Sequence, residues 1–274
     1  MSNRTDLALE SYESKETTRL DGVSVTENEN LTTVEVLTQN GANKIGKPVG
    51  KYQTLKVSSF VNDTDLLDGR LQEFAEVLSE LLPPNIKSVL AVGLGNKKIT
   101  ADSLGPAASS FVLATRHIIR ELKNDTGLGE LFPVSCIDTG VLADTGIESA
   151  EIIKGVVNQI KPSCVIVIDA LASGSTERLG TTVQLSDVGI SPGSGVGNHR
   201  YEISEKTLGV PVISIGIPTV VSTCFISGRN EDCAFVTPRE IDEICRQGAK
   251  LIGMGINVCL QKNLTVNDLM ALVG

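Results

Sequence analysis

Residues 88–106, SVLAVGLGNKKITADSLGP, decide the fold of this chain, because they predict a buried strand, a glycine turn and a helix start in close succession. The apolar run Ser88–Leu94 is short and aliphatic, which is typical of a strand covered on both faces. Gly93–Asn96 (GLGN) ends the run, Asp102 follows, and apolar residues then recur at helical spacing over residues 104–122. The sequence therefore predicts a strand–loop–helix unit that carries a carboxylate in its loop.

The same alternation of strand and helix continues along the chain. Cys164–Asp169 (CVIVID) is the clearest buried strand, since it is dense in β-branched residues. Further strands are predicted at 31–38, 54–58, 133–138, 181–186 and 211–216, and helices at 71–82, 104–122, 146–160 and 237–261. This order predicts an α/β fold with a mostly parallel sheet and helices on both faces.

The N-terminal part of the chain differs in composition from the rest. The first 50 residues are polar and rich in Thr, Asn, Glu and Lys, and they contain only one clear period-2 strand pattern. We expect residues 7–64 to form a small β-rich region that packs on an α/β core of residues 65–274.

Composition and charge exclude several classes of protein. The net charge is −9 and the pI is about 4.9, without the Lys and Arg clusters that phosphate-backbone binding requires. Neither a secretory signal nor an apolar run of membrane-spanning length is present, so we expect a cytoplasmic protein with no direct nucleic-acid or membrane partner. The six cysteines lack CxxC spacing and the two histidines lie far apart, so neither a zinc site nor a disulfide framework is expected.

Two carboxylates stand where the predicted strands end. Asp169 closes CVIVID, and Asp102 lies in the loop after the strand at 88–94. Because ligands of open α/β sheets bind outside the carboxyl ends of the strands, neighbouring strands would bring both carboxylates to one crevice. A shared cleft moves the pKa of one carboxyl group up and that of the other down, which yields an acid and a base. Such a pair can activate water and protonate a leaving amine.

Plainer roles are open for the same residues. Asp102 can cap the helix that follows it, and Asp169 can cap the segment after CVIVID. Gly93–Asn96 could form a nucleotide loop, although a dinucleotide fingerprint needs a third glycine where Lys98 stands. The glycine-rich segment Ser191–Asn198 can be a flap over a cleft, a peptide-binding loop or an ordinary surface loop.

Segments spread over nearly the whole chain, in order, resemble the spore germination proteases. These are endopeptidases of spore-forming bacteria that degrade small acid-soluble spore proteins. The matching stretches are RTDLALE (4–10), VGLGN (92–96) with ADSLGP (101–106), ATRH (114–117), TGIESAEIIKGVV (145–157), VIVIDALAS (165–173), SPGSGVGN (191–198), LGVPVISIGIPTVV (208–221), TPREID (237–242) and KLIGMGIN (250–257). Each stretch alone is weak, but the combination is highly specific.

The resemblance implies a fold, an activity and a pair of site residues. The fold would be the α/β fold of the hydrogenase maturation proteases. The activity would be that of an atypical aspartate-dependent endopeptidase without a metal or another cofactor. The two key aspartates of the family match Asp102 and Asp169, the same pair that the strand ends indicate.

The resemblance also implies a zymogen that is trimmed at its N-terminus. Family substrates are cut after an acidic residue that is followed by Ile, Phe or Leu and then Ala, and Thr5-Asp6-Leu7-Ala8 is similar to that site. We therefore expect residues 1–6 to be a propeptide, with processing between Asp6 and Leu7. The implied partners are small acid-soluble spore proteins in the spore core, and the implied assembly is a homotetramer.

Three further residues are candidates for contact with substrate or with the developing oxyanion. Asn96 follows the first predicted strand, Asp144 is added by the loop TGVLADTG at 139–146, and Asn198 ends the glycine-rich segment. Two other functions are open at this point. The aspartates could hold a divalent ion in a metal-dependent maturation protease, or the glycine loops could serve a non-catalytic peptide- or nucleotide-binding module.

Overall fold

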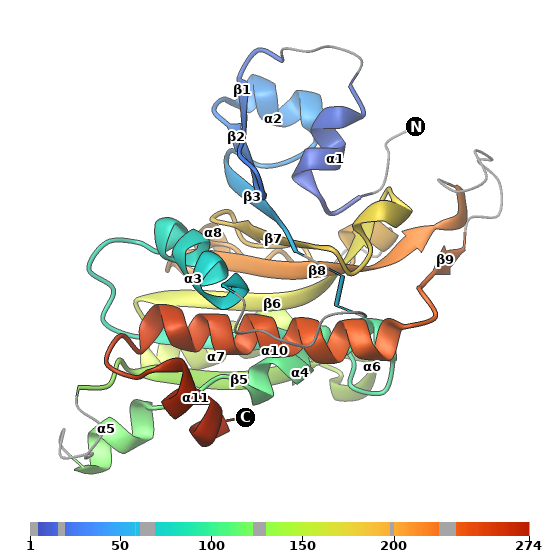
Figure 1. Cartoon of the computed structure of the whole chain (residues 1–274). Coiled ribbons are helices and arrows are strands. Elements are labelled where there is room, and N and C mark those ends of the chain that lie inside the picture. The colour runs from blue at the N-terminus through green and yellow to red at the C-terminus, as the bar shows by residue number, and fades with distance from the viewer. Residues whose placement is uncertain are drawn as a thin grey trace.

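The computed structural model describes residues 5–15, 20–57, 59–60, 69–122, 130–197, 200–224 and 234–273. Within these residues nine strands form one mixed sheet in the order β1-β2-β3-β7-β8-β6-β4-β5, and β9 pairs with β8 (Figure 1). The strands are β1 (Val23–Glu27), β2 (Leu31–Val36), β3 (Gly50–Lys56), β4 (Val89–Leu94), β5 (Val134–Gly140), β6 (Cys164–Ser173), β7 (Thr182–Ser186), β8 (Val212–Ser222) and β9 (Phe235–Val236). The predicted α/β fold is confirmed.

The helices connect and cover these strands. The α-helices are α1 (Ala8–Glu13), α2 (Gln39–Ile45), α3 (Arg70–Leu81), α4 (Leu104–Ser110), α5 (Arg116–Leu122), α6 (Leu142–Thr145), α7 (Ser149–Ile160), α8 (Glu205–Leu208), α10 (Ile241–Leu260) and α11 (Val266–Val273). A short 3₁₀ helix, η1 (Thr100–Asp102), precedes α4. The long α10 runs across the front of the sheet in Figure 1.

The parallel part of the sheet is its centre. Strand β6 pairs in parallel with β4 on one side and with β8 on the other, and β4 pairs in parallel with β5. Their carboxyl ends therefore lie at one edge of the sheet, where ligands of this fold class bind.

The N-terminal strands extend the same sheet. Strand β3 pairs antiparallel with β7, with Tyr52 opposite Ser186, and β1 and β2 follow outward as an antiparallel pair. A small apolar cluster that includes Val34, Val36 and Tyr52 packs this end together. The expected boundary at residue 64 lies outside the described residues, so the division at that point stays a prediction.

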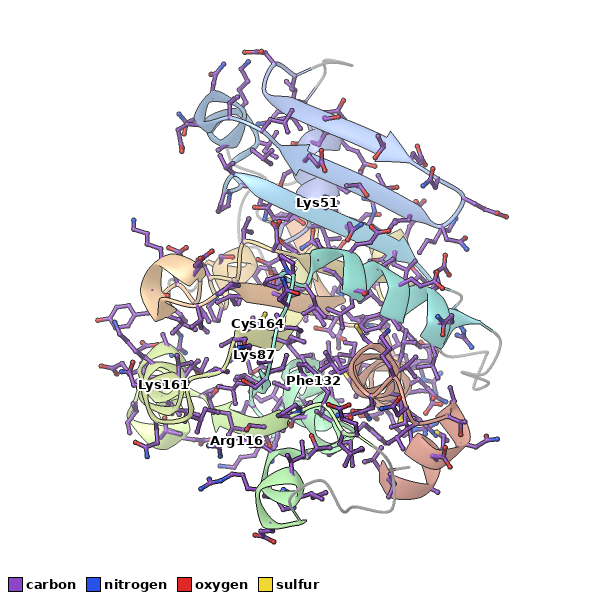
Figure 2. All side chains as sticks on the ribbon, turned by 90° about the vertical axis from the view of Figure 1, so that its left-hand side faces the viewer. Lys51, Lys87, Arg116, Phe132, Lys161 and Cys164 are labelled. Atoms are coloured by element: carbon purple, nitrogen blue, oxygen red, sulfur yellow. The ribbon has the colours of Figure 1, made fainter. Side chains whose placement is uncertain are left out.

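Side chains alternate between the two faces of the sheet, as a strand repeat of two requires. Val89 and Ala91 of β4 pack in the core with α3, α4 and α10, whereas Leu90 and Val92 pack in a second core with α7. Figure 2 shows the two layers on opposite sides, with Lys161 after α7 on one side and α10 on the other, while Cys164 begins β6 between them. Helices on both faces agree with the near-continuous apolar runs of the central strands.

The single helix expected over residues 104–122 is wrong, because the structure has α4 and α5 there with a turn between them. Asn257 of α10 causes the break by bonding to the turn. Its side-chain amide accepts from the Leu113 N–H at 2.8 Å and donates to the Phe111 carbonyl at 2.7 Å. A partner so distant in sequence satisfies backbone groups that a continued helix would otherwise pair.

Two predicted helix starts also differ. Helix α10 begins at Ile241 rather than near Thr237, whose hydroxyl donates to the Thr219 carbonyl of β8 at 2.8 Å and therefore does not cap the helix. Helix α7 begins at Ser149 with a capping box between Glu148 and Glu151.

The cysteines depart from expectation at one position. Cys136, Cys164, Cys245 and Cys259 are free thiols, but Cys224 is disulfide-bonded. The expectation that the chain has no disulfide is therefore wrong. The sequence pattern could not reveal it, because spacing alone does not fix which cysteines approach.

Candidate active site

The loop after β4 fixes Asp102 at the mouth of the sheet. Gly95 turns the chain with a positive φ of 113°, and a Cβ there would overlap the backbone oxygen of Asp102. The Asn96 N–H lies 2.9 Å from Asp102 Oδ2 and 3.0 Å from the Asp102 carbonyl oxygen. The loop thus binds its own carboxylate with a backbone amide. No side-chain cap bond is present at the start of α4, so the carboxylate does not serve as its N-cap.

Asp169 lies inside β6 rather than at its end, because the strand continues to Ser173. It pairs with Gly216 of β8, and only 5% of Asp169 is exposed. Its Oδ1 accepts from the Ala170 N–H at 2.9 Å. Asp169 is therefore a buried carboxyl group at the carboxyl-terminal part of the central strand.

One cavity of about 310 Å³ brings the two aspartates together. Asp102 and Asp169 both line it, at the edge of the sheet where β4, β6 and β8 end. Other lining residues come from three loops and from the N-terminal segment: Asp6, Gly140, Val141, Leu142, Glu148, Pro192, Gly193, Val196, Arg200 and Tyr201. The cavity size suits an extended peptide side chain and a water molecule.

The two carboxyl groups titrate differently from free ones. Burial raises the pKa of Asp169 well above its usual value, and the charges of Asp102 and Asp6 raise it further. Burial also raises the pKa of Asp102, opposed by the Asn96 N–H and by the charge of Arg200. The sequence predicted one pKa raised and one lowered. Both are raised, because desolvation acts on each group and disfavours its charged form.

A family model described as germination protease matches residues 3–234. The chain belongs to the germination protease family. Germination protease of Priestia megaterium is 41% identical over 97% of this chain and 76% of its own length. That of Caldanaerobacter subterraneus subsp. tengcongensis is 39% identical over 98% of both chains, and that of Clostridium perfringens is 36% identical over 97% of both.

A solved structure also resembles the chain. The NiFe hydrogenase maturation protease HycI from Thermococcus kodakarensis covers 66% of this chain and 99% of its own, with a TM-score of 0.40 and 20% sequence identity. Its similarity is too low for residues to be compared one by one.

In this germination protease family member, the N-terminal segment lies in the candidate site. The Asp6 N–H donates to the Ala172 carbonyl at 2.9 Å, so the segment runs beside the end of β6. The Asp6 carbonyl accepts from Lys47 Nζ at 2.9 Å and from Gln184 Nε2 at 3.1 Å. Lys47 also donates to the Thr5 carbonyl at 2.9 Å. The peptide bond after Asp6 is thus held at its carbonyl by two side-chain donors.

The structure separates the other predicted site residues. The Asn96 side chain is not among the cavity-lining residues, and its Oδ1 accepts from the Lys98 N–H at 2.9 Å. Asp144 also lies outside the lining set and pairs with Lys98 at 3.1 Å on the exposed rim. Asn198 lies outside the described residues. The predicted pair Asp6 and Leu7 is fully within the site region, and Leu7 is 0% exposed.

Sequence reasoning missed the basic and amide groups of the site. Arg200 lines the cavity and lies 4.0 Å from Glu148, and Lys47 and Gln184 reach it from α2 and β7. Isolated residues of this kind carry no local motif. The only available signal was that Arg200 directly follows the glycine-rich segment that was singled out.

Two searches of the described residues complete the picture. No cluster of three or more His, Cys, Asp or Glu side chains there could hold a metal ion. Among the described helices none is both long and apolar enough to cross a membrane.

Proposed function

We propose that this protease is an endopeptidase that starts the degradation of small acid-soluble spore proteins during germination, in the spore core. It would cut after an acidic residue and use Asp102 and Asp169 to activate water. The observation that carries the proposal is that both carboxyl groups line one cavity in a member of this family. The raised pKa of each group supports acid–base chemistry near neutral pH.

The two aspartates are proposed to have different roles. Asp102 is the base, because Arg200 and the Asn96 N–H favour its charged form. Asp169 is the acid, because burial and two neighbouring carboxylates favour its protonated form. The observed titration would still belong to the pair as a whole.

Hydrolysis then proceeds in two proton transfers. Asp102 takes a proton from water as the water oxygen bonds to the carbonyl carbon. Asp169 gives its proton to the leaving nitrogen as the C–N bond breaks, which yields a carboxyl group and an amine. Asp102 returns its proton through solvent, and the pair is restored.

Lys47 and Gln184 are proposed to stabilise the oxyanion when the chain processes itself. Both donate to the carbonyl oxygen of Asp6, the oxygen that would carry the developing charge. Donors of this kind are commonly worth about 3 kcal/mol of transition-state stabilisation. The position of these two residues makes them better candidates than Asn96.

The chain is proposed to be a zymogen that cleaves between Asp6 and Leu7. Its leader occupies part of the cavity, so a protein substrate could not enter fully until residues 1–6 leave. A homotetramer is the proposed assembly. The test is incubation with a purified small acid-soluble spore protein, with and without EDTA, followed by mass spectrometry. Cleavage after an acidic residue in both samples supports the proposal, and cleavage only without EDTA would favour a metal-dependent protease.

A further inference from the structure

The side chain of Asp6 is bound in a pocket that is distinct from the donors at its carbonyl. Its Oδ2 accepts from the Ala172 N–H at 2.8 Å, and its Oδ1 accepts from Ser194 Oγ at 2.8 Å. Gly195 closes the pocket, since a Cβ there would overlap Asp6 Oδ2. Both carboxylate oxygens are thus bound, and the space around them fits a short side chain.

The surroundings of this pocket do not depend on the leader. Helix α1, which follows Leu7, is fixed by the buried Glu10. This carboxylate accepts from Ser173 Oγ at 2.6 Å, from the Gly174 N–H at 2.5 Å and from Arg178 at 3.2 Å. If the chain is cut after Asp6, these contacts all remain. Departure of the leader would therefore empty the pocket without removing the elements around it.

We propose that the Ala172 N–H, the Ser194 hydroxyl and Gly195 form the subsite for the acidic side chain that precedes the cleaved bond. In the uncut chain Asp6 fills it, and after processing the acidic residue of a protein substrate takes the same place. The leader thus blocks the enzyme by occupying its specificity pocket. This inference rests on the proposed function and adds the residues that select the substrate.

The chemistry of the pocket explains a preference for a carboxylate. An apolar side chain would leave the Ala172 N–H and the Ser194 hydroxyl without acceptors, which is costly in a partly buried site. A carboxylate satisfies both donors, and hydrogen bonds to a charged acceptor are roughly twice as strong as neutral ones. The nearby ammonium of Lys47 adds a favourable charge, because Asp6 and Lys47 interact electrostatically.

The test measures cleavage of a synthetic peptide of residues 1–12 by the full-length protein after its own leader has been released. A second peptide carries Asp6→Ala. Wild type is compared with Ser194→Ala and with Ser191→Ala, an exposed serine of the same segment that serves as the control. We expect Ser194→Ala to lower kcat/KM about tenfold on the Asp peptide and to leave the Ala peptide unchanged. Ser191→Ala should change neither value.

Equal losses on both peptides, or no loss on either, would overturn the subsite. Docking is measured separately in the uncut chain by hydrogen exchange of the Asp6 and Ala172 amides. Faster exchange in Ser194→Ala than in Ser191→Ala supports the pocket, and equal exchange contradicts it. Absence of peptide cleavage by wild type would refute the proposed function instead, because the exchange result does not require catalysis.

Discussion

Asp102 and Asp169 line the same cavity, although one comes from the loop after β4 and the other from inside the central strand β6. The parallel pairing of β4 and β6 causes this approach, since it aligns the carboxyl ends of the two strands. Burial without a cationic partner in direct contact then leaves Asp169 as the group with the stronger rise in pKa. The arrangement favours an acid and a base that share one proton, and it has measurable consequences.

Asp169→Asn should stabilise the protein while it removes activity. A carboxyl group whose folded-state pKa is raised binds protons more tightly when folded, so its stabilising contribution is full at low pH. This contribution is lost as the pH rises from the unfolded to the folded pKa. At pH 7 the buried group therefore costs stability. We expect a rise of about 1 kcal/mol in unfolding free energy, or about 2–4 °C in Tm, at pH 7.

The measurement is thermal unfolding of wild type and Asp169→Asn at pH 4 and pH 7. The difference between them should be smaller at pH 4, where the wild-type group is protonated in both states. A variant that unfolds at a lower temperature at pH 7 would show that Asp169 holds the fold rather than the chemistry.

Asp102→Asn should remove activity and keep the loop after β4. An asparagine oxygen can still accept from the Asn96 N–H, so the turn at Gly95 should persist. Loss of a general base typically costs about 10²–10⁴-fold in rate. Cleavage is followed by mass spectrometry and folding by circular dichroism. Asp144→Asn is the matched control, because Asp144 lies on the rim and pairs with Lys98. Equal losses in both variants would contradict the assignment.

Arg200→Gln should move the acidic limb of the pH–rate profile to higher pH. Arg200 lowers the pKa of Asp102 by favouring its charged form, so its removal raises that pKa. The base would then be protonated at a pH where the wild-type base is still ionised. Arg120→Gln on α5, an exposed arginine outside the cavity-lining set, is the control and should leave the profile unchanged. An unshifted acidic limb in Arg200→Gln would remove Asp102 as the base.

Lys47→Met should slow processing at the Asp6–Leu7 bond. The variant removes one of the two donors to the Asp6 carbonyl and leaves Gln184 in place. Loss of one oxyanion donor typically lowers the rate about 10²–10³-fold. The intact and cut chains are separated by mass. Lys44→Met is the control from the same helix, since Lys44 pairs with the exposed Asp21. Similar rates in both variants would exclude Lys47 from the reaction.

The sequence predicted the elements that one local pattern defines. CVIVID, the apolar run after Ser88 and the capping residues near Glu148 gave the central strands and α7, because burial on both faces leaves an aliphatic signature. Asp102 and Asp169 were found for the same reason, since strand ends identify where ligands bind.

The rest depended on contacts between distant segments. The break between α4 and α5 is made by Asn257, and the strand β3 is ordered by pairing with β7. Lys47 and Gln184 reach the site only because the N-terminal strands join the sheet. A polar residue whose partner is remote in sequence has no periodicity to reveal it.

The most direct test of the central claim is cleavage of a small acid-soluble spore protein by wild type, Asp102→Asn and Asp169→Asn at equal concentration. Folding of each protein is verified in the same buffer. We predict cutting after an acidic residue by wild type and rates at least about 100-fold lower in both folded variants. Wild-type rates in either folded variant would contradict catalysis by this pair of aspartates.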